Sequence, residues 1–422
     1  MHQRMRVLTI SDLFPSPLRP ADDIFVEHQV KHLVPYCSST VVVPLRVFPP
    51  ARLWRLLFRP GQAGAAWRDW LKEVRSVPSE AGPKGIEVQR LRYTSPPRQV
   101  LHGLWGFFAY VSLRGKLHLL DNQRHFQLIH AHYASPAGVV ALLANRWMRV
   151  PVVVSVHGAD VTFTARQNVL GRRVVRWVFD QADAILANSS WTKQEIVQLG
   201  GSPEKVQIVR LGAEPPEAVV GPLPEAESDG LTLLSIGYLT ERKGHAYVLH
   251  ALRRLLDQGH RLRYVIVGDG PRQHELQALA DSLGLTDHVR FEGYKRHEDV
   301  WPYLAGCDIF VLPSWKEAFG VVYVEALSLG KPVVGCQGQG GPEDIRSLGD
   351  CIELVIPRDT QSLTAALQRL IENPVRRAEM GSIGKAIARE HFSWKRNAQA
   401  TFEIYQRVVG NRDGQGEGNP QV

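Results

Sequence analysis

Cysteine is scarce in this 422-residue sequence: only four occur, at positions 37, 307, 336 and 351, and no two form a C-x-x-C pair. Such scattered thiols argue against a zinc site or a disulfide framework and favour a reducing cytoplasm. Long hydrophobic runs are also missing, since no apolar stretch reaches the roughly 18–20 uncharged residues needed to cross a bilayer. The first apolar run, at residues 5–10, ends at Ser11 and Asp12, which indicates a β-strand instead of a signal peptide.

Size and charge are those of a basic, soluble globular protein. A chain of 422 residues is too long for one ordinary core, so two domains of about 200 residues each are expected. The formal net charge of +8 favours an anionic partner, such as a nucleotide, a phospholipid surface, a polyanionic substrate or nucleic acid. An ordinary basic surface explains the charge equally well.

Short β-branched runs alternate with helix-length segments along nearly the whole chain. This alternation predicts an α/β protein with parallel sheets covered by helices on both faces. In the first half the predicted strands are residues 6–10, 40–44, 127–131, 152–156, 184–187 and 206–209. In the second half they are residues 231–236, 263–267, 289–291, 308–312, 332–335 and 353–356.

One segment, residues 46–120, does not fit the alternation. It interleaves arginines with aromatic residues, among them Trp54, Trp67, Trp70 and Trp105. Rings at the headgroup level and arginines on lipid phosphates are typical of a membrane interface. An ordinary helical insertion with its aromatics in the core is the alternative. The composition would also suit RNA, but no recognition motif supports nucleic-acid binding.

The clearest local signal lies where the predicted strand at 308–312 ends in a loop and a helix begins near Gly320. A helix N-terminus presents unpaired N–H groups and favours anions, so this junction can hold phosphates or sugar oxygens. Glu317 precedes the helix, and Glu325 lies more than one turn inside an otherwise apolar helix, where its carboxylate needs a partner. A ribose with two hydroxyl donors is one such partner. The alternative is that Glu317 caps the helix and Glu325 pairs with a neighbouring arginine.

The two glutamates and their surroundings resemble the hallmark of retaining family 4 glycosyltransferases of the GT-B fold. Glu317 and Glu325 are separated by seven residues and followed by Gly330-Lys331-Pro332. Further matches in the family's order are HAH (130–132), SVHGAD (155–160), ADAILANS (182–189), SIGYLTERKG (235–244), VGDGP (267–271) and FEG (291–293). The resemblance covers nearly the whole chain and is weakest in the Arg/Trp-rich segment.

The resemblance implies two Rossmann-like parallel-sheet domains that face a cleft. An acceptor-side domain would span residues 1–214, with the Arg/Trp-rich insertion at 46–120, and a nucleotide-sugar domain would span 231–392. The Pro- and Glu-rich stretch at 215–230 is predicted to be the linker. A C-terminal helix at 393–410, with Trp394 as a packing anchor, would cross back to the first domain. The Gly-, Asn- and Gln-rich tail at 411–422 is predicted to be disordered.

The resemblance also implies roles for individual residues on the donor side. Lys243 would meet the donor diphosphate, and Glu325 would take the ribose hydroxyls. Gly293 and Tyr294 lie where the family lines the base pocket. Arg242, beside Lys243, is the candidate to share the diphosphate.

Two candidate catalytic residues, Glu317 and His157, would act on the transferred sugar. Glu317 would hold that sugar together with the backbone N–H groups of Phe319 and Gly320. His157 follows the predicted strand at 152–156 and would reach the sugar from the first domain. The resemblance favours attack on the same face as the leaving group, with Glu317 positioning the sugar and not acting as a nucleophile.

The sequence departs from the family pattern at two places. Tyr238 stands where many members carry an arginine that shares the diphosphate with the lysine, and Arg242 is the candidate that replaces it. The loop at residues 14–23 lacks the glycines that let a backbone approach phosphate, and Asp22 and Asp23 would repel it. This loop would then serve the acceptor.

The resemblance implies a retaining hexosyltransferase that uses a nucleotide sugar and a saccharide or lipid-linked acceptor in polysaccharide or envelope glycan synthesis. No Asp-x-Asp sequence occurs, so no metal and no other cofactor are expected. The expected location is the cytoplasm, with peripheral contact at the anionic inner face of the membrane. A non-catalytic, glycan-binding or scaffolding member of the same fold is the alternative. A Rossmann oxidoreductase is disfavoured, because the glycines at 268 and 270 lack the third glycine of the dinucleotide motif.

Overall fold

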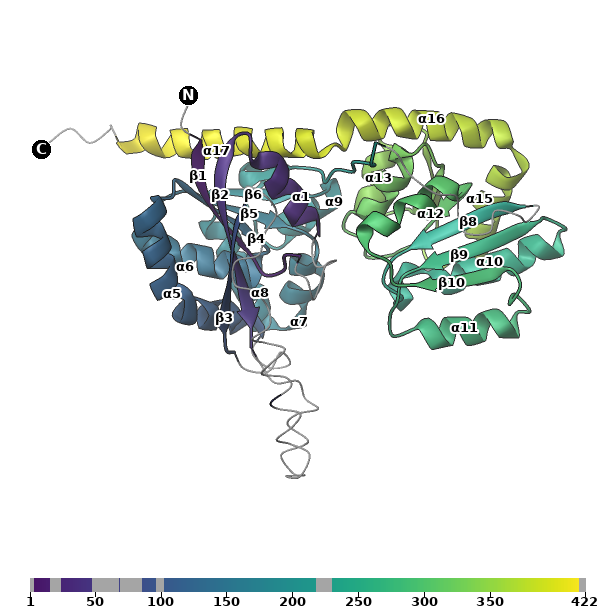
Figure 1. Cartoon of the computed structure of the whole chain (residues 1–422), viewed down its shortest axis with the longest axis horizontal. Helices are drawn as coiled ribbons and strands as arrows, with labels where there is room; N and C mark the ends of the chain where they lie inside the picture. The colour runs from purple at the N-terminus through teal and green to yellow at the C-terminus, as the bar shows by residue number, and fades with distance from the viewer. Residues whose placement is uncertain are drawn as a thin grey trace, which may run out of the picture. The chain divides into compact units, whose positions relative to one another are not determined.

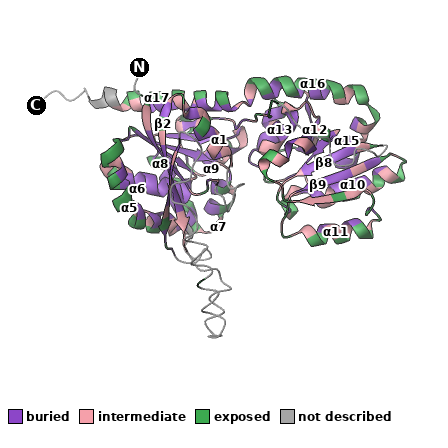
Figure 2. Ribbon diagram, viewed as in Figure 1, coloured by how far each residue is buried: buried purple, intermediate pink, exposed green. Residues whose placement is uncertain are grey.

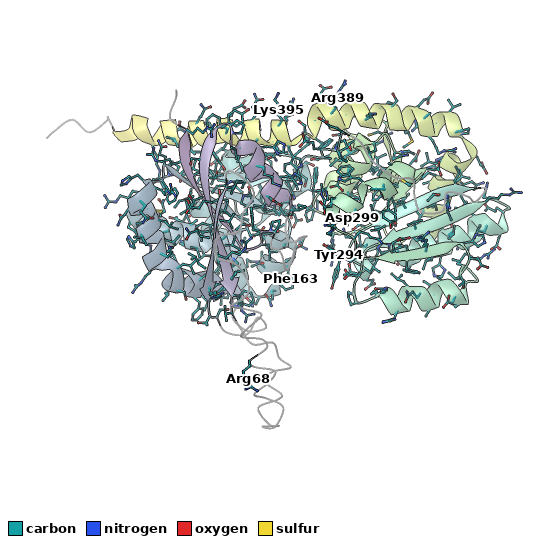
Figure 3. The ribbon with its side chains drawn as sticks, in the orientation of Figure 1. Arg68, Phe163, Tyr294, Asp299, Arg389 and Lys395 are labelled. Atoms are coloured by element: carbon teal, nitrogen blue, oxygen red, sulfur yellow. The ribbon has the colours of Figure 1, made fainter. Side chains whose placement is uncertain are left out.

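The computed structural model describes residues 4–15, 24–47, 68, 86–95, 102–217 and 230–416. Trp54, Trp67 and Trp70 of the Arg/Trp-rich insertion lie outside these residues, as do most of the N-terminal loop and most of the predicted linker. Arg68, labelled in Figure 3, is the single described residue between 48 and 85.

The chain divides into two compact units, which confirms the two predicted parallel-sheet domains. Unit 1 comprises Met1–Asn188, Thr192–Val209 and Ala398–Val422, and unit 2 comprises Ser189–Trp191 and Arg210–Asn397. Figure 1 shows each unit as a sheet flanked by helices. The long segment of unit 2 begins at Arg210, ahead of the stretch predicted to be the linker at 215–230. One reason is that the N–H of Ala213 donates to the carbonyl of Phe392 at 2.7 Å, which ties this segment to unit 2.

Unit 1 contains a seven-stranded sheet with the order β3-β2-β1-β4-β5-β6-β7, in which every neighbouring pair is parallel. Its strands are β1 (Met5–Ser11), β2 (Cys37–Arg46), β3 (Glu87–Tyr93), β4 (Leu128–His132), β5 (Val152–Val156), β6 (Ala184–Ala187) and β7 (Val206–Ile208). All of them except β3 were predicted. β3 lies at the sheet edge inside the Arg/Trp-rich segment, and its alternation of polar and apolar residues gives no continuous β-branched run.

The described helical segments of unit 1 connect these strands and cover the sheet. They are α1 (Ile24–Leu33), η1 (His102–Leu104), α5 (Trp105–Arg124), η2 (Ala134–Gly138), α6 (Val139–Met148), η3 (Asp160–Thr164), α7 (Ala165–Gln167), α8 (Val169–Gln181), α9 (Ser190–Gln198) and η4 (Pro203–Lys205). Asn168 begins α8 because its side chain accepts the N–H of Gly171, which satisfies one free donor of the first turn. In α5, Leu113, Leu117 and Leu120 form the buried stripe.

Unit 2 contains a six-stranded parallel sheet with the order β10-β9-β8-β11-β12-β13. Its strands are β8 (Leu231–Ile236), β9 (Leu262–Val267), β10 (Val289–Gly293), β11 (Ile309–Val311), β12 (Val333–Cys336) and β13 (Ile352–Val355), and all six were predicted. Both sheets are apolar in their central strands because helices cover both faces.

The helical segments of unit 2 follow the strands in alternation. They are η5 (Glu241–Lys243), α10 (His245–Asp257), α11 (Gln273–Ser282), η6 (His297–Asp299), α12 (Trp301–Gly306), α13 (Val321–Ser328), α14 (Gly340–Arg346), α15 (Thr360–Glu372) and α16 (Pro374–His391). Figure 2 shows the strands largely in the colour of buried residues and the outer sides of α5, α11 and α16 in that of exposed ones. The topology places the loops that follow β8, β10 and β11 at the same edge of the unit 2 sheet.

The last helix, α17 (Trp394–Gly416), begins in unit 2 and continues in unit 1. Tyr405 and Val408 pack in the core cluster of unit 1, which explains why this helix belongs to it. The helix extends past its predicted end at 410, so residues 411–416 are helical where a disordered tail was expected. Arg412 contributes to this, because its guanidinium pairs with Asp183 at 3.2 Å. Among the described residues, no helix is both long enough and apolar enough to cross a membrane.

Candidate active site

Lys243 lies in the loop between β8 and α10 of unit 2. The chain turns sharply on both sides of it, at Gly237 (φ 156°) and Gly244 (φ 78°), and a Cβ at Gly244 would lie 2.5 Å from the carbonyl oxygen of Pro313. Glycine is therefore required at 244 for the loop to pack against the end of β11. The Lys243 side chain is 12% exposed, so its ammonium group is held in place and is not a solvated surface cation.

The Lys243 ammonium group contacts the carboxylate of Glu317. Lys243 Nζ lies 2.6 Å from Glu317 Oε2, and the Ser314 hydroxyl donates to the same oxygen at 2.9 Å. The Arg242 guanidinium lies 3.7 Å from Oε2 and is 46% exposed. Glu317 Oε1 bonds to none of the described residues. The structure thus brings three predicted site residues together, although 74 positions separate Lys243 from Glu317.

Glu317 is ionised despite its burial. Burial alone would raise the pKa of this carboxyl, but the charges of Lys243 and Arg242 and the hydrogen bonds from Lys243 and Ser314 hold it below its ordinary value. The backbone of Glu317 is also fixed, because its N–H donates to Gln339 Oε1 at 3.0 Å and its carbonyl accepts from Gly340 at 3.1 Å. This carboxylate is therefore both charged and rigid at neutral pH.

The N-terminus of α13 lies directly after Glu317. Gly320 adopts φ 75°, a conformation that disfavours side chains, and a Cβ there would meet the Tyr323 ring at 2.6 Å. The Phe319 side chain is buried and packs against Phe392, with the two ring planes inclined by 54°. Only the backbone of Phe319 is therefore available to a ligand. Within the described residues, the N–H groups of Phe319, Gly320 and Val321 donate to no acceptor. These groups are suited to bind an anion or a sugar oxygen.

Glu325 belongs to a separate contact. Its Oε1 lies 2.7 Å from His297 Nε2, and its Oε2 bonds to none of the described residues. The alternative partner considered from the sequence, a neighbouring arginine, is not the one observed. His297, in η6, is the residue that the sequence did not single out; its ring packs edge-on against Trp301.

The two predicted base-pocket residues lie at the end of β10: Gly293 is its last residue, and Tyr294 follows it. Gly293 adopts φ 67°, and no atom lies within 4 Å of where its Cβ would be. Tyr294 is 46% exposed, and Figure 3 labels its side chain together with that of Asp299 in the same loop region of unit 2. No hydrogen bond or ion pair joins either residue to the Lys243–Glu317 pair among the described residues.

Glycines hold the loop of Glu317 against α14. A Cβ at Gly341 would lie 1.7 Å from the Phe319 carbonyl oxygen, and one at Gly340 would lie 2.1 Å from that of Ala318. Both contacts are with backbone, which has no flexible side-chain end that could move away.

Gly341→Ala is expected to destabilise unit 2 by about 1–3 kcal/mol, because the added methyl group must displace the loop at 317–319. Gly115→Ala is the matched control. No atom lies within 4 Å of that position in α5, so it should stabilise unit 1 by up to about 1 kcal/mol. Urea unfolding of both variants measures the two changes. Equal stability of Gly341→Ala and the parent protein would show that the loop is not held by this contact.

His157 lies at the end of β5 in unit 1 among other aromatic rings. Its Nε2 is 3.1 Å from His132 Nδ1, and the two rings are stacked with their planes 4° apart. Phe25 and Tyr133 pack on the same ring at centroid distances of 4.7 and 5.0 Å. Burial lowers the pKa of His157 to about 3, so the imidazole is neutral at physiological pH.

Asp160 fixes the loop that carries His157. Its carboxylate accepts the N–H of Ala134 at 2.6 Å and that of His157 at 3.3 Å. Burial raises the pKa of Asp160 to about 6, and the backbone hydrogen bonds oppose that rise. The sequence motif contained Asp160 but gave it no role.

No group of three or more histidine, cysteine or carboxylate side chains within the described residues is arranged to hold a metal ion. The residues that sequence analysis missed are the partners of the predicted ones: Ser314, Gln339, His297 and His132. Of these, only His132 had a signal, because it lies in the H-A-H motif at the end of a predicted strand.

Comparison with known families gives two matches that cover different parts of the chain. Residues 224–387 match the family model described as glycosyl transferases group 1. Residues 73–215 match the one described as glycosyltransferase family 4.

Two curated relatives show how far the similarity extends. A D-inositol 3-phosphate glycosyltransferase from Streptomyces scabiei is 31% identical over 317 residues, which is 68% of this chain and 69% of the relative. TuaC of Bacillus subtilis, a glycosyltransferase assigned to teichuronic acid biosynthesis, is 26% identical over 96% of this chain and 99% of its own length.

Solved structures share the fold along nearly the whole chain. Sucrose-phosphate synthase from Thermosynechococcus elongatus superimposes with a TM-score of 0.73 at 18% identity, covering 97% of this chain and 100% of its own. Anabaena HepE in complex with UDP-glucose superimposes with a TM-score of 0.68 at 21% identity, covering 96% of this chain and 100% of its own.

Proposed function

Because this chain belongs to glycosyltransferase family 4, we propose that it is a retaining hexosyltransferase that uses a nucleotide-sugar donor and no metal ion. The observation that carries the proposal is the cluster at the N-terminus of α13. There a buried, ionised carboxylate, a nearly buried ammonium group and a run of unpaired backbone N–H groups lie next to one another. Each of these groups matches a part of a nucleotide sugar.

The diphosphate of the donor is the partner of Lys243 in this proposal. The ammonium group exchanges part of its contact with Glu317 for the phosphate oxygens, and the N–H groups at the start of α13 add further positive potential. Many family members carry an arginine at the position of Tyr238. In this chain Arg242, which lies 3.7 Å from Glu317 and is half-exposed, takes over its role. Charge on the leaving diphosphate is then neutralised by fixed protein groups, without a divalent ion.

The transferred sugar is held by Glu317. Because Oε2 already accepts hydrogen bonds from Lys243 and Ser314, the remaining oxygen, Oε1, accepts a sugar hydroxyl. A carboxylate restrained by several donors is well suited to position a sugar and poorly suited to attack it. The acceptor hydroxyl therefore attacks from the face that the diphosphate leaves. That His157 contacts the sugar stays a prediction from the family resemblance.

The nucleoside is bound near β10 and α13. Glu325 Oε2, which has no partner among the described residues, accepts a ribose hydroxyl, while His297 holds Oε1. The base lies along Gly293 and Tyr294. HepE, a structural neighbour, was solved with UDP-glucose, which supports a uridine nucleotide among the donors to test first.

The acceptor is a saccharide or a lipid-linked saccharide of an envelope or exported polysaccharide. Relatives assigned to teichuronic acid and amylovoran biosynthesis support this class. Cytoplasmic location and contact with an anionic membrane face stay predictions. In the described part of the Arg/Trp-rich segment, α5 exposes Phe108, Val111 and Leu119, which is compatible with such contact.

A panel of nucleotide sugars tests the function. The correct donor is expected to raise the melting temperature by on the order of 5 °C at about 100 times its dissociation constant. Transfer to an acceptor, followed by mass spectrometry, is expected to continue in excess chelator and to give a product with the donor's anomeric configuration. Strict dependence on added divalent metal, or an inverted product, would contradict the proposed mechanism. Donor binding without transfer or donor hydrolysis would favour the non-catalytic alternative.

A further inference from the structure

An arginine-lined cavity lies in unit 1 between α7 and α8 on one side and the second half of α9 on the other. Its volume is about 410 Å³, within the range of roughly 300–1,000 Å³ that is typical of small-molecule sites. The charged residues that line it are Arg166, Arg172, Arg176 and Glu195. None of the residues that were assigned to the donor or to the transferred sugar lines this cavity.

The arginine-lined cavity carries a positive charge that the protein does not compensate. Its one carboxylate, Glu195, is already paired with the Arg166 guanidinium. Among the described residues, the guanidinium groups of Arg172 and Arg176 form no ion pair and no hydrogen bond. Three arginines and one glutamate leave the lining with a net charge of +2. Both unpaired side chains are exposed, so a dissolved anion can reach them.

The orientation of Arg176 is not explained by the two partners that such a residue usually has. Asp180 lies four positions further along α8, but its carboxylate accepts from the Gln181 amide at 2.8 Å. Three carbonyls in the last turn of α9 already accept the N–H groups of residues 199–201, so they need no arginine as a cap. The Arg176 guanidinium instead lies against Gly200, where a Cβ would be 3.2 Å from its Nε. Its donors are therefore left for a ligand.

An oxyanion that is attached to a sugar matches this lining. Guanidinium groups bind carboxylates and phosphates through two parallel N–H donors. The volume equals that of roughly a dozen water molecules, which is more than a single oxyanion fills. Leu199 is the one apolar side chain in the lining, so the cavity offers little surface to an acyl chain. The Gln198 amide can pair with sugar hydroxyls.

We propose that the arginine-lined cavity binds a negatively charged sugar residue of the acceptor, through a carboxylate or a phosphate group on that sugar. The inference rests on the proposed function, in which the acceptor is a saccharide. In this arrangement Arg172 and Arg176 bind the oxyanion, and the pair of Arg166 and Glu195 joins α7 to α9 at one side of the cavity. The cavity thereby selects acidic acceptors over neutral ones.

Binding of model sugars tests the cavity without any donor. The full-length protein is titrated by calorimetry at low ionic strength with trigalacturonate, glucose 6-phosphate, inorganic phosphate and neutral maltotriose. At least one of the two acidic sugars should bind about tenfold more tightly than inorganic phosphate, and maltotriose should not bind measurably. The tighter of the two identifies the oxyanion as a carboxylate or a phosphate. Failure of both acidic sugars to bind would overturn the proposal, as would equal affinity for inorganic phosphate.

Two double variants then test where the acidic sugar binds. Arg172→Gln combined with Arg176→Gln removes both unpaired guanidinium groups and should weaken binding by about 10- to 100-fold. Arg146→Gln combined with Arg173→Gln is the matched control, because it removes the same charge from exposed arginines of unit 1 that do not line the cavity. Its affinity should change by less than about twofold. Equal losses in the two double variants would show that only the overall charge matters and would overturn the proposal.

Anionic vesicles distinguish a sugar site from a membrane contact. Sedimentation with phosphatidylglycerol vesicles should be the same for the parent protein and for the Arg172/Arg176 double variant. Loss of vesicle binding in that variant, with its binding of acidic sugars unchanged, would replace the proposal with a membrane contact.

The inference and the proposed function can fail separately. A parent protein that binds an acidic sugar through Arg172 and Arg176, but transfers no sugar from any nucleotide sugar, would refute the proposed function alone. A parent protein that transfers sugar but binds neither acidic sugar would refute the present inference alone.

Discussion

Lys243→Met is expected to lower kcat/KM for glycosyl transfer by about 10²–10³-fold, the cost of removing one fixed donor from a site of developing charge. Methionine has nearly the length of lysine without its charge, so the change removes the ammonium group and keeps most of the packing. The same substitution leaves the buried carboxylate of Glu317 with only Ser314 and the more distant Arg242 as partners. Loss of one member of a buried ion pair should destabilise unit 2 by about 3 kcal/mol. Steady-state kinetics and urea unfolding measure the two effects on one preparation.

A second substitution separates the loss of stability from the loss of catalysis. In Lys243→Met combined with Glu317→Gln, no unpaired charge remains buried, so most of the stability should return while transfer stays lost. Recovery of transfer in the double variant would mean that Lys243 acts only by neutralising Glu317 and does not bind the diphosphate. Lys316→Met is the matched control: it removes an exposed lysine one position from Glu317 and should change neither quantity by more than a small fraction.

The strands of both sheets were predictable because a strand buried on both faces must be apolar and is rich in β-branched residues. This holds for β8 and β9, whose bounds differ little from the prediction. It fails for β3, because an edge strand is buried on alternate residues only and its sequence here is Glu-Val-Gln-Arg-Leu-Arg-Tyr. The end of α17 was also missed, since glycine and asparagine lower local helix propensity while the Arg412–Asp183 pair is a tertiary contact.

The positions of the site residues followed from motifs, but their pairing did not. Glu317 and Lys243 were assigned to the sugar and to the diphosphate as separate parts, whereas the structure has their side chains in contact. The partner of Glu325 is a histidine 28 positions away, and the partner of His157 lies on a different strand. Such contacts depend on which strands are neighbours in the sheet, which local periodicity does not specify. A motif therefore locates a functional group, and the fold decides its charge state and its partners.

Acidification from pH 7.5 to 5.5 is expected to destabilise unit 1 by about 4 kcal/mol through the buried histidines His130, His132 and His157. Burial lowers the pKa of His130 and of His157 to about 3, and it lowers the pKa of His132 well below its ordinary value. In the unfolded chain each ring takes up a proton near pH 6.5. Below that pH the unfolded state binds more protons than the folded state, so the free energy of unfolding falls as pH falls. Each histidine contributes about 1.4 kcal/mol over this interval.

Two other groups set the expected contrast between the units. The pKa of Asp160 is raised from its ordinary value of 3.8 to about 6. As the pH falls through 6, the folded state therefore takes up a proton that the unfolded state does not yet bind. This uptake stabilises the folded state and offsets part of the histidine effect at the acid end. In unit 2, His245 is the buried histidine whose pKa is lowered to about 3, which predicts a loss of only about 1.4 kcal/mol there.

Hydrogen exchange of peptides from β4–β5 and from β8–β9, corrected for intrinsic rates, measures the two units separately. His132→Asn should reduce the pH dependence of unit 1 by about one third, since one of the three titrating rings is gone. If β4 and β5 are equally protected from exchange at both pH values, these histidines do not take up protons when unit 1 unfolds, which would contradict the prediction.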